Sequence, residues 1–232
     1  MNRTMVIAID GPAGAGKSTV CRLLAKKLGY AYLDTGAMYR AMAWSALEED
    51  LAIENESEIA RHIESVPLRF TMEDGAIGIY SGKRRLDEQL RRPEISGWAS
   101  RISRLKCVRD YLTHCQRQLG KIGNIVAEGR DMTTIVFPDA PVRVFLQAEL
   151  KVRAQRRLLE YRSKGITADP AALEEQIRAR DEADEQRSLA PLRAAPGVCV
   201  LDTSCMGIEE VVERLLEIVR RKAGEKVSSI EG

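Results

Sequence analysis

Apolar positions along the chain follow two spacings that alternate with each other. Short, largely apolar runs, typical of strands buried on both faces of a sheet, occur at 5–9, 30–33, 124–127, 142–146 and 198–202. Between these runs the apolar residues recur every three or four positions, as expected for helices, at 18–28, 37–49, 57–65, 93–121, 149–164, 170–187 and 208–222. The alternation predicts an α/β fold, in which a doubly wound parallel sheet of five strands carries helices on both faces.

One segment departs from this alternation. Residues 67–72 and 76–81 are two strand-like runs on either side of Glu73-Asp74-Gly75, a sequence typical of a hairpin turn. Residues 82–86 are suited to a third strand. We therefore expect a small antiparallel β subdomain, inserted at about residues 63–95.

Residues 11–18, between the first strand and the first helix, read Gly-Pro-Ala-Gly-Ala-Gly-Lys-Ser. They match the phosphate-loop pattern G-x-x-x-x-G-K-[ST] at every fixed position. The glycines let the backbone come close to an anion, which successive N–H groups then bind. In this pattern Lys17 reaches the β- and γ-phosphates, and the Ser18 hydroxyl is a ligand of Mg²⁺. The alternative is a glycine-rich connection without a ligand; the flanking strand and helix favour a triphosphate site.

Composition narrows the class of protein. The 36 basic and 34 acidic residues give a net charge of +2, which argues against a protein that coats nucleic acid. The five cysteines are odd in number and lack a C-x-x-C pair, so we expect reduced and mostly buried thiols. The first residues lead directly into a strand, and no apolar run is long enough to span a bilayer. We expect a cytoplasmic monomer that binds neither nucleic acid nor membrane.

Two charged sequences follow predicted strands, where the ligands of α/β sheets bind. Arg40 lies one helical turn after Gly36 and suits a second phosphate, although a solvated arginine is the alternative. Asp34 or Thr35 alone would be explained as a helix cap. Glu128-Gly129-Arg130-Asp131 is either a buried ion pair or a ligand clamp, and its position at the sheet edge favours the clamp.

The two helices expected at 149–164 and 170–187 are rich in arginine. Arg153, Arg156 and Arg157 share one helical face, and so do Arg180, Asp184 and Arg187. One interpretation is exposed helices with weak ion pairs. The other is a mobile lid whose arginines close over a triphosphate, since three like charges on one face repel each other unless they share an anion.

Two phosphate sites and an arginine-rich lid indicate a kinase whose acceptor already carries phosphate. Such an acceptor needs no general base, because its phosphate is largely ionised at pH 7. Its main obstacle is repulsion between the two substrates, which arginines and Mg²⁺ offset. The sequence thus favours in-line phosphoryl transfer, with lid closure excluding water.

Four strings carry a family resemblance: Ile9–Thr19, Leu33–Arg40, Glu128–Asp131 and Thr134–Asp139. Together with the arginine-rich helices, they resemble bacterial cytidylate kinases in sequence and in order over about residues 5–222. The resemblance implies a P-loop NTPase-type fold and transfer of the γ-phosphoryl group of ATP, with Mg²⁺, to CMP or dCMP in pyrimidine nucleotide metabolism. It also implies one domain over 1–232, with a core (about 1–62, 96–150 and 188–222), a monophosphate-binding insertion (about 63–95) and a helical lid region (about 151–187).

The resemblance also assigns roles to residues. ATP would be bound by Gly11, Pro12, Ala13, Gly14, Ala15, Gly16, Lys17, Ser18, Thr19, Arg153, Arg156 and Arg157. CMP would be bound by Asp34, Thr35, Tyr39, Arg40, Ser100, Arg109, Arg130, Asp131, Arg180, Asp184 and Arg187. The catalytic set would be Lys17, Arg130, Arg156 and Arg187, and Ser18 would contact Mg²⁺. Asp131 suits a cytosine reader, because a carboxylate accepts from the N4 amino group and uracil has no donor there.

The chain departs from the family pattern at Ala13, where many family members carry serine, so one hydroxyl near the acceptor is absent.

Other classes of protein fit less well. The chain lacks the Asp-Gly-Phe/Tyr-Pro-Arg string of adenylate kinases and the Asn-Lys-x-Asp and Asp-x-x-Gly strings of GTPases. A shikimate kinase would not need the arginines for a phosphorylated acceptor. Val126-Ala127-Glu128 is a poor Walker-B strand, which disfavours a nucleic-acid-processing ATPase.

Overall fold

The computed structural model describes residues 4–53, 55–163 and 165–228, which form two compact units. We call residues 6–28 and 126–228 the phosphate-loop unit, and residues 4–5 and 29–125 the hairpin unit.

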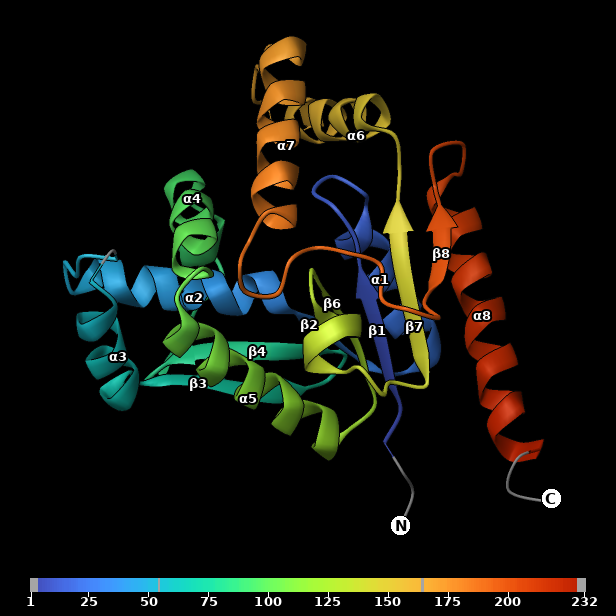
Figure 1. Cartoon of the computed structure of the whole chain (residues 1–232), viewed down its shortest axis with the longest axis horizontal. Helices are drawn as coiled ribbons and strands as arrows, with labels where there is room; N and C mark the ends of the chain where they lie inside the picture. The colour runs from blue at the N-terminus through green and yellow to red at the C-terminus, as the bar shows by residue number, and fades with distance from the viewer. Residues whose placement is uncertain (1–3, 54, 164, 229–232) are drawn as a thin grey trace. The chain divides into compact units, whose positions relative to one another are not determined.

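The phosphate-loop unit is built on strands in the order β6-β1-β7-β8. Their bounds are β1 Val6–Asp10, β6 Ile125–Gly129, β7 Val142–Gln147 and β8 Cys199–Asp202. β1 and β7 pair in parallel from Ile7↔Val142 to Asp10↔Phe145, and β7 and β8 pair in parallel from Val144↔Cys199 to Gln147↔Asp202. The carboxyl ends of β1, β7 and β8 therefore lie at one edge, the usual place for ligands in such sheets (Figure 1).

Four α-helices and one π-helix complete this unit: α1 Lys17–Leu28, η2 Met132–Val136, α6 Leu150–Ser163, α7 Pro170–Glu185 and α8 Ile208–Ser228. The strand β1 is apolar apart from its last residue and is buried along its whole length. Helices α6 and α7 lie beyond the carboxyl ends of β7 and β8 (Figure 1). They pack through a small core of Ala154, Leu173 and Ile177, which Leu150, Leu158 and Tyr161 cover. The helical region predicted as a lid thus has its own apolar contact.

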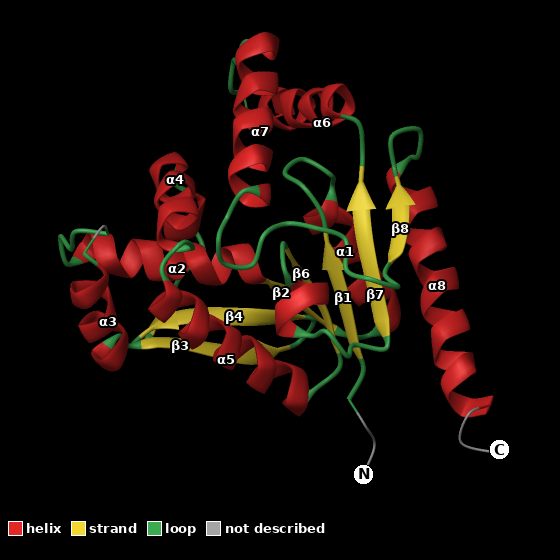
Figure 2. Cartoon of the chain, viewed as in Figure 1, coloured by secondary structure: helices red, strands yellow, loops and turns green. Residues whose placement is uncertain are grey.

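The hairpin unit contains β2 Ala31–Asp34, β3 Leu68–Glu73, β4 Ala76–Ser81 and β5 Arg84–Arg85. Its helices are α2 Thr35–Glu48, α3 Glu56–Ser65, η1 Gln89–Arg91, α4 Pro93–Ile102 and α5 Lys106–Ile122. β3 and β4 form an antiparallel hairpin from Leu68↔Ser81 to Glu73↔Ala76 (Figure 2). β5 pairs antiparallel with β4. β4 runs parallel to β2 at Tyr32↔Ala76.

The α/β class with a mostly parallel sheet and the antiparallel hairpin are confirmed. The helical pattern predicted over 93–121 is confirmed, but the structure divides it into two helices, because the backbone leaves the helix at Ser103–Leu105 and Leu105 is extended. Two hydrogen bonds hold this break: the Ser103 hydroxyl donates to the carbonyl of Ser100 (2.8 Å), and Arg109 donates to the carbonyl of Ser103 (3.1 Å). The last helix is longer than predicted and reaches Ser228.

All five cysteines are free thiols, as predicted. The expectation that most are buried is wrong: Cys21 is buried, Cys205 is exposed and the others are half-buried. Cys199 belongs to β8, which lies at the end of the strand order and pairs with a strand along one edge only. Within the described part of the chain, no helix is long and apolar enough to cross a membrane.

Candidate active site

The phosphate loop connects the buried strand β1 to helix α1, as the sequence predicts. Gly11, Gly14 and Gly16 all have positive φ, at 153°, 75° and 82°. A Cβ atom at Gly11 would lie 2.1 Å from the carbonyl oxygen of Leu146 on β7. Glycine is therefore required there for close packing as well as for its backbone conformation.

Lys17 is enclosed by the loop that carries it. Its side chain is buried, and Nζ donates to the carbonyl oxygens of Gly11 (2.7 Å) and Pro12 (2.8 Å). Burial, and then the positive charge of Arg130, lower the pKa of Lys17 to about 7, while the carboxylate of Glu128 opposes the shift. The loop thus holds an amine that gains a proton readily when an anion approaches. Ser18 and Thr19 are exposed at the start of α1.

Two of the three arginines predicted on one face of α6, Arg153 and Arg156, lie close to the phosphate loop. The buried Arg153 donates to the carbonyls of Ala148 (2.8 Å) and Ala13 (2.9 Å), and it forms an ion pair with Asp181. Arg156 donates to the hydroxyl (3.1 Å) and the carbonyl (2.5 Å) of Thr203. One Arg156 nitrogen lies 3.9 Å from the position of a Cβ added at Gly16. Both guanidinium groups therefore lie beside the path of the phosphate loop.

Arg157 behaves differently from its two neighbours. It forms an ion pair with Glu160 one turn along the same helix (2.9 Å) and lies over the ring of Tyr161. Both partners in the ion pair are partly exposed, at 32% and 43%. Arg157 thus matches the exposed ion-pair interpretation rather than the shared arginine face.

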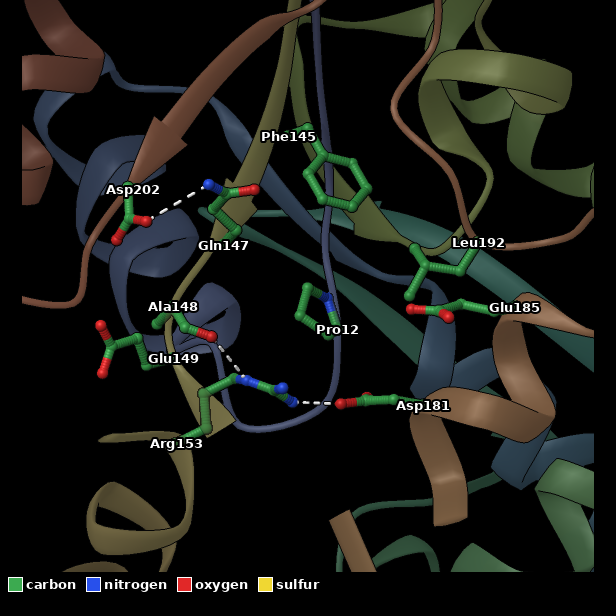
Figure 3. Close-up of a pocket in the computed structure, with 10 residues that line it drawn as sticks. All are labelled: Pro12, Phe145, Gln147, Ala148, Glu149, Arg153, Asp181, Glu185, Leu192 and Asp202. Atoms are coloured by element: carbon green, nitrogen blue, oxygen red, sulfur yellow. Dashed lines mark hydrogen bonds and ion pairs between the residues drawn. The ribbon is translucent and has the colours of Figure 1, made fainter. Parts of the chain in front are cut away.

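A pocket of about 330 Å³ opens next to the phosphate loop (Figure 3). Its walls come from the loop, from the ends of β7 and β8, and from α6 and α7. They are formed by Pro12, Phe145, Gln147, Ala148, Glu149, Arg153, Asp181, Glu185, Leu192 and Asp202. Arg153 and Asp181 form an ion pair with each other at its wall (Figure 3).

Three residues predicted to bind the acceptor meet in one cluster of the same unit. The carboxylate of Asp184 pairs with Arg130 (2.8 Å) and with Arg187 (3.4 Å). Asp184 and Arg187 are largely buried, with side chains 11% and 9% exposed. Two guanidinium groups that share one carboxylate present more positive than negative charge, which suits an incoming phosphate. Asp131, which follows Arg130 in the sequence, is buried. Arg180 is exposed, but its positive charge lies close enough to Lys17 to lower the pKa of that lysine.

Asp10, at the last position of β1, is a residue that our sequence reasoning missed. Its fully buried carboxylate accepts from the backbone N–H groups of Met132 (2.8 Å) and Thr133 (2.7 Å) and from the Thr133 hydroxyl (2.6 Å). Burial raises the pKa of Asp10 to about 6, although the Thr133 hydrogen bonds favour the charged form. Asp10 thereby fixes the segment just after Arg130 and Asp131. An ionisable residue ending an otherwise apolar strand was the available signal.

Within the hairpin unit, the residues at the start of α2 form a local cluster. Asp34 is the N-cap, accepting from the Ala37 N–H (2.9 Å), and its other oxygen pairs with Arg40 (2.9 Å). A Cβ at Gly36 would lie 3.1 Å from Asp34 Oδ1 and 3.2 Å from Arg40 Nη1. Thr35 is buried next to them. The capping role is thus confirmed for Asp34, and the same carboxylate orients Arg40.

Three residues predicted to bind CMP, Tyr39, Ser100 and Arg109, lie in one local arrangement of the hairpin unit. The buried Arg109 lies over the Tyr39 ring, 5.7 Å from its centroid. The same side chain donates to the carbonyl of Ser103 at the break between α4 and α5. Ser100 is tied to this break through its own carbonyl. Tyr39, Ser100 and Arg109 are therefore positioned by one local arrangement.

Comparisons with known proteins identify the family of this chain. A family model described as cytidylate kinase matches residues 7–221. A cytidylate kinase from Carboxydothermus hydrogenoformans is 45% identical over 218 residues, covering 94% of this chain and 98% of the relative. One from Syntrophotalea carbinolica is 42% identical over 222 residues, covering 96% and 94%.

A solved structure of an uncharacterized protein from Eubacterium ventriosum resembles this chain in fold, with a TM-score of 0.54 and 10% identity. The match covers 94% of this chain and 99% of that one. The sequence matches span the phosphate loop, both arginine clusters and the hairpin, so the evidence for kinship covers all the candidate residues. The chain belongs to the cytidylate kinase family.

Proposed function

We propose that this chain transfers the γ-phosphoryl group of ATP to CMP or dCMP, giving CDP or dCDP and ADP. The observation that carries the proposal is the family match over residues 7–221, which includes a phosphate loop with a buried lysine. We further propose that the enzyme acts as a cytoplasmic monomer, without nucleic acid or membrane.

On the donor side, the loop residues Gly11–Thr19 bind the triphosphate through their N–H groups. Lys17 neutralises charge on the β- and γ-phosphates, and Arg156 and Arg153 act from α6. The hydrogen bond of Arg153 to the carbonyl of Ala13 and the position of Arg156 close to Gly16 support this role. We place Arg157 at the outer edge of the set, because it pairs with Glu160.

On the acceptor side, Arg130 and Arg187 bind the phosphate, and Arg180 and Asp184 contact the sugar hydroxyls. The shared pairing of Asp184 with Arg130 and Arg187 supports a common task for them. Asp131 accepts from the cytosine amino group, and Asp10 holds its segment in place. From the hairpin unit, Arg40 binds the acceptor phosphate with Asp34, Thr35 and Tyr39 beside it, and Ser100 and Arg109 contact the base.

The chemistry follows from charge. The acceptor phosphate supplies an ionised oxygen as the nucleophile, so no residue has to remove a proton. In-line transfer proceeds through a loose transition state with negative charge on the transferred group. Lys17 and the arginines stabilise that charge, and exclusion of water prevents loss of the phosphoryl group to hydrolysis.

Mg²⁺ enters with ATP. No group of three or more histidine, cysteine or acidic side chains suited to a metal occurs among the described residues. This fits an ion that is held mainly by phosphates and water with one protein oxygen. The exposed Ser18 hydroxyl at the start of α1 would be that oxygen. When bound, the ion offsets charge on the β- and γ-phosphates.

An ADP-release assay with a panel of acceptors tests the proposal. The purified chain is given Mg-ATP with CMP, dCMP, UMP, AMP or shikimate, and ADP is followed by a coupled reaction. We expect CMP and dCMP to give the highest kcat/KM, with UMP below them. Release of ADP with another acceptor, while CMP and dCMP give no more than buffer, would overturn the proposal.

A further inference from the structure

Asp181 on α7 binds the phosphate loop itself. Its Oδ1 accepts from the backbone N–H of Ala13 (3.1 Å), and its Oδ2 pairs with Arg153. Both side chains are largely buried, at 11% and 9% exposure. Arg153 in turn donates to the carbonyl of Ala13. The peptide groups of Ala13 are thus held on both sides, by a carboxylate and by a guanidinium.

These contacts have the chemistry of a bound phosphate. Backbone N–H groups of the loop are donors for anions, and a carboxylate oxygen accepts from them as a phosphate oxygen does. Ala13 has no side-chain hydroxyl, so its N–H is the donor that it offers. While Arg153 is paired with Asp181, its charge is balanced and attracts a triphosphate less. Asp181 therefore opposes nucleotide binding twice, through the Ala13 N–H and through Arg153.

We propose that Asp181 is a positioning residue that sets donor affinity, its carboxylate competing with the triphosphate for the Ala13 N–H and for Arg153. Asp181 lies on α7 between Arg180 and Asp184, which belong to the proposed acceptor set. Displacement of its carboxylate by ATP releases α7 from the loop, and the helix that carries the acceptor residues responds to the donor. The inference rests on the proposed binding of ATP at this loop.

The test compares Asp181→Asn with the wild-type protein. The affinity for Mg-ATP without acceptor is measured by calorimetry, and KM is measured separately for ATP and CMP. We expect Asp181→Asn to bind Mg-ATP about fivefold more tightly, the size of one ordinary hydrogen bond, because the amide oxygen can still accept weakly from Ala13. The KM for ATP falls to match, while the KM for CMP changes by less than about twofold. A merely structural role would weaken ATP binding or change both KM values together.

Glu185→Gln is the matched control. Glu185 lies one turn further along α7, lines the same pocket and is exposed. Its substitution removes the same charge as Asp181→Asn, while the carboxylate bound to Ala13 and Arg153 is that of Asp181. Equal tightening in both variants would mean that net charge, and not competition for the loop, is responsible. Unchanged or weaker ATP binding by Asp181→Asn would also overturn the inference.

A second variant tests the inference in case Asp181→Asn does not fold, because that substitution leaves Arg153 buried without its charged partner. Asp181→Glu keeps that charge but moves the carboxylate away from the Ala13 N–H, and we expect it to bind Mg-ATP about twofold more tightly. Unchanged binding by this variant counts against the inference. Failure of the wild-type protein to bind Mg-ATP would instead contradict the proposed function.

Discussion

Two ionisable residues are buried at the two ends of the phosphate loop, Asp10 at the end of β1 and Lys17 at the start of α1. Asp10 holds the segment that follows β6, and Lys17 is held by the carbonyls of its own loop. Burial shifts both pKa values toward neutrality, to about 6 for Asp10 and about 7 for Lys17. The protonation state of such groups responds to small changes in local charge, and groups with shifted pKa values are common at functional sites.

Nucleotide binding should therefore be linked to protonation of Lys17. A bound triphosphate raises the pKa of a neighbouring amine, so at pH 8, above the pKa of about 7, binding takes up a proton. Affinity for Mg-ATP should fall as the pH rises from 7 to 9. Calorimetry at pH 8 in two buffers with different ionisation heats measures the uptake. It should vanish in Lys17→Met; absence of uptake in the wild-type protein would show that Lys17 is already charged.

The hydrogen bonds that the Asp10 carboxylate accepts should stabilise the fold. Burial, which raises its pKa to about 6, makes its charge unfavourable to folding above that pH, and we expect the hydrogen bonds to outweigh this cost. Asp10→Asn places an amide NH₂ against N–H and hydroxyl donors, and at least one of them loses its acceptor. We expect a loss of about 1–3 kcal/mol in the free energy of unfolding at pH 7.5, measured by urea titration. Asp139→Asn, an exposed change a few residues beyond the same segment, is the control. A variant as stable as the wild-type protein would show that these hydrogen bonds contribute little.

At the scale of elements, the packing of α6 against α7 positions the arginines. Ile177 is 5% exposed within the small core that joins the two helices. Ile177→Ala should destabilise this contact by about 2–4 kcal/mol and raise the KM for ATP, because Arg153 and Arg156 lose their support. Leu159→Ala on the exposed side of α6 should leave KM unchanged. Equal KM values in the two variants would show that the packing does not position the arginines.

Elements whose signals are local were predictable. The phosphate loop, the hairpin at 73–75 and the cap at Asp34 each depend on a few neighbouring residues. The break between α4 and α5 was missed because no glycine or proline marks it and the apolar spacing continues through it. The hydrogen bonds that stabilise the break come from the Ser103 and Arg109 side chains, and the spacing of apolar residues gives no information about them.

The site was predictable in its residue types but less so in its contacts. Spacing along a helix placed Arg153, Arg156 and Arg157 on one face, yet the structure separates Arg157 from the other two. The bond between Asp181 and Ala13 joins residues 168 positions apart, which no local pattern encodes. Asp10 was missed for the same reason, since its partners lie more than 120 positions away.

At the scale of the whole molecule, the candidate residues are divided between two compact units. The phosphate-loop unit holds Lys17 with the arginines of α6 and the cluster of Arg130, Asp184 and Arg187. The hairpin unit holds Asp34 with Arg40, and Tyr39 with Arg109. The family match covers residues from both, so the activity belongs to the whole chain.

The central claim is that phosphate passes from ATP to a cytidine monophosphate. The full chain is incubated with Mg-ATP labelled at the γ-phosphate and with CMP, and the products are separated by chromatography. The account predicts that the label appears in CDP, at a rate that depends on CMP concentration. Label found only in inorganic phosphate, or in CDP no faster than without the protein, would contradict it.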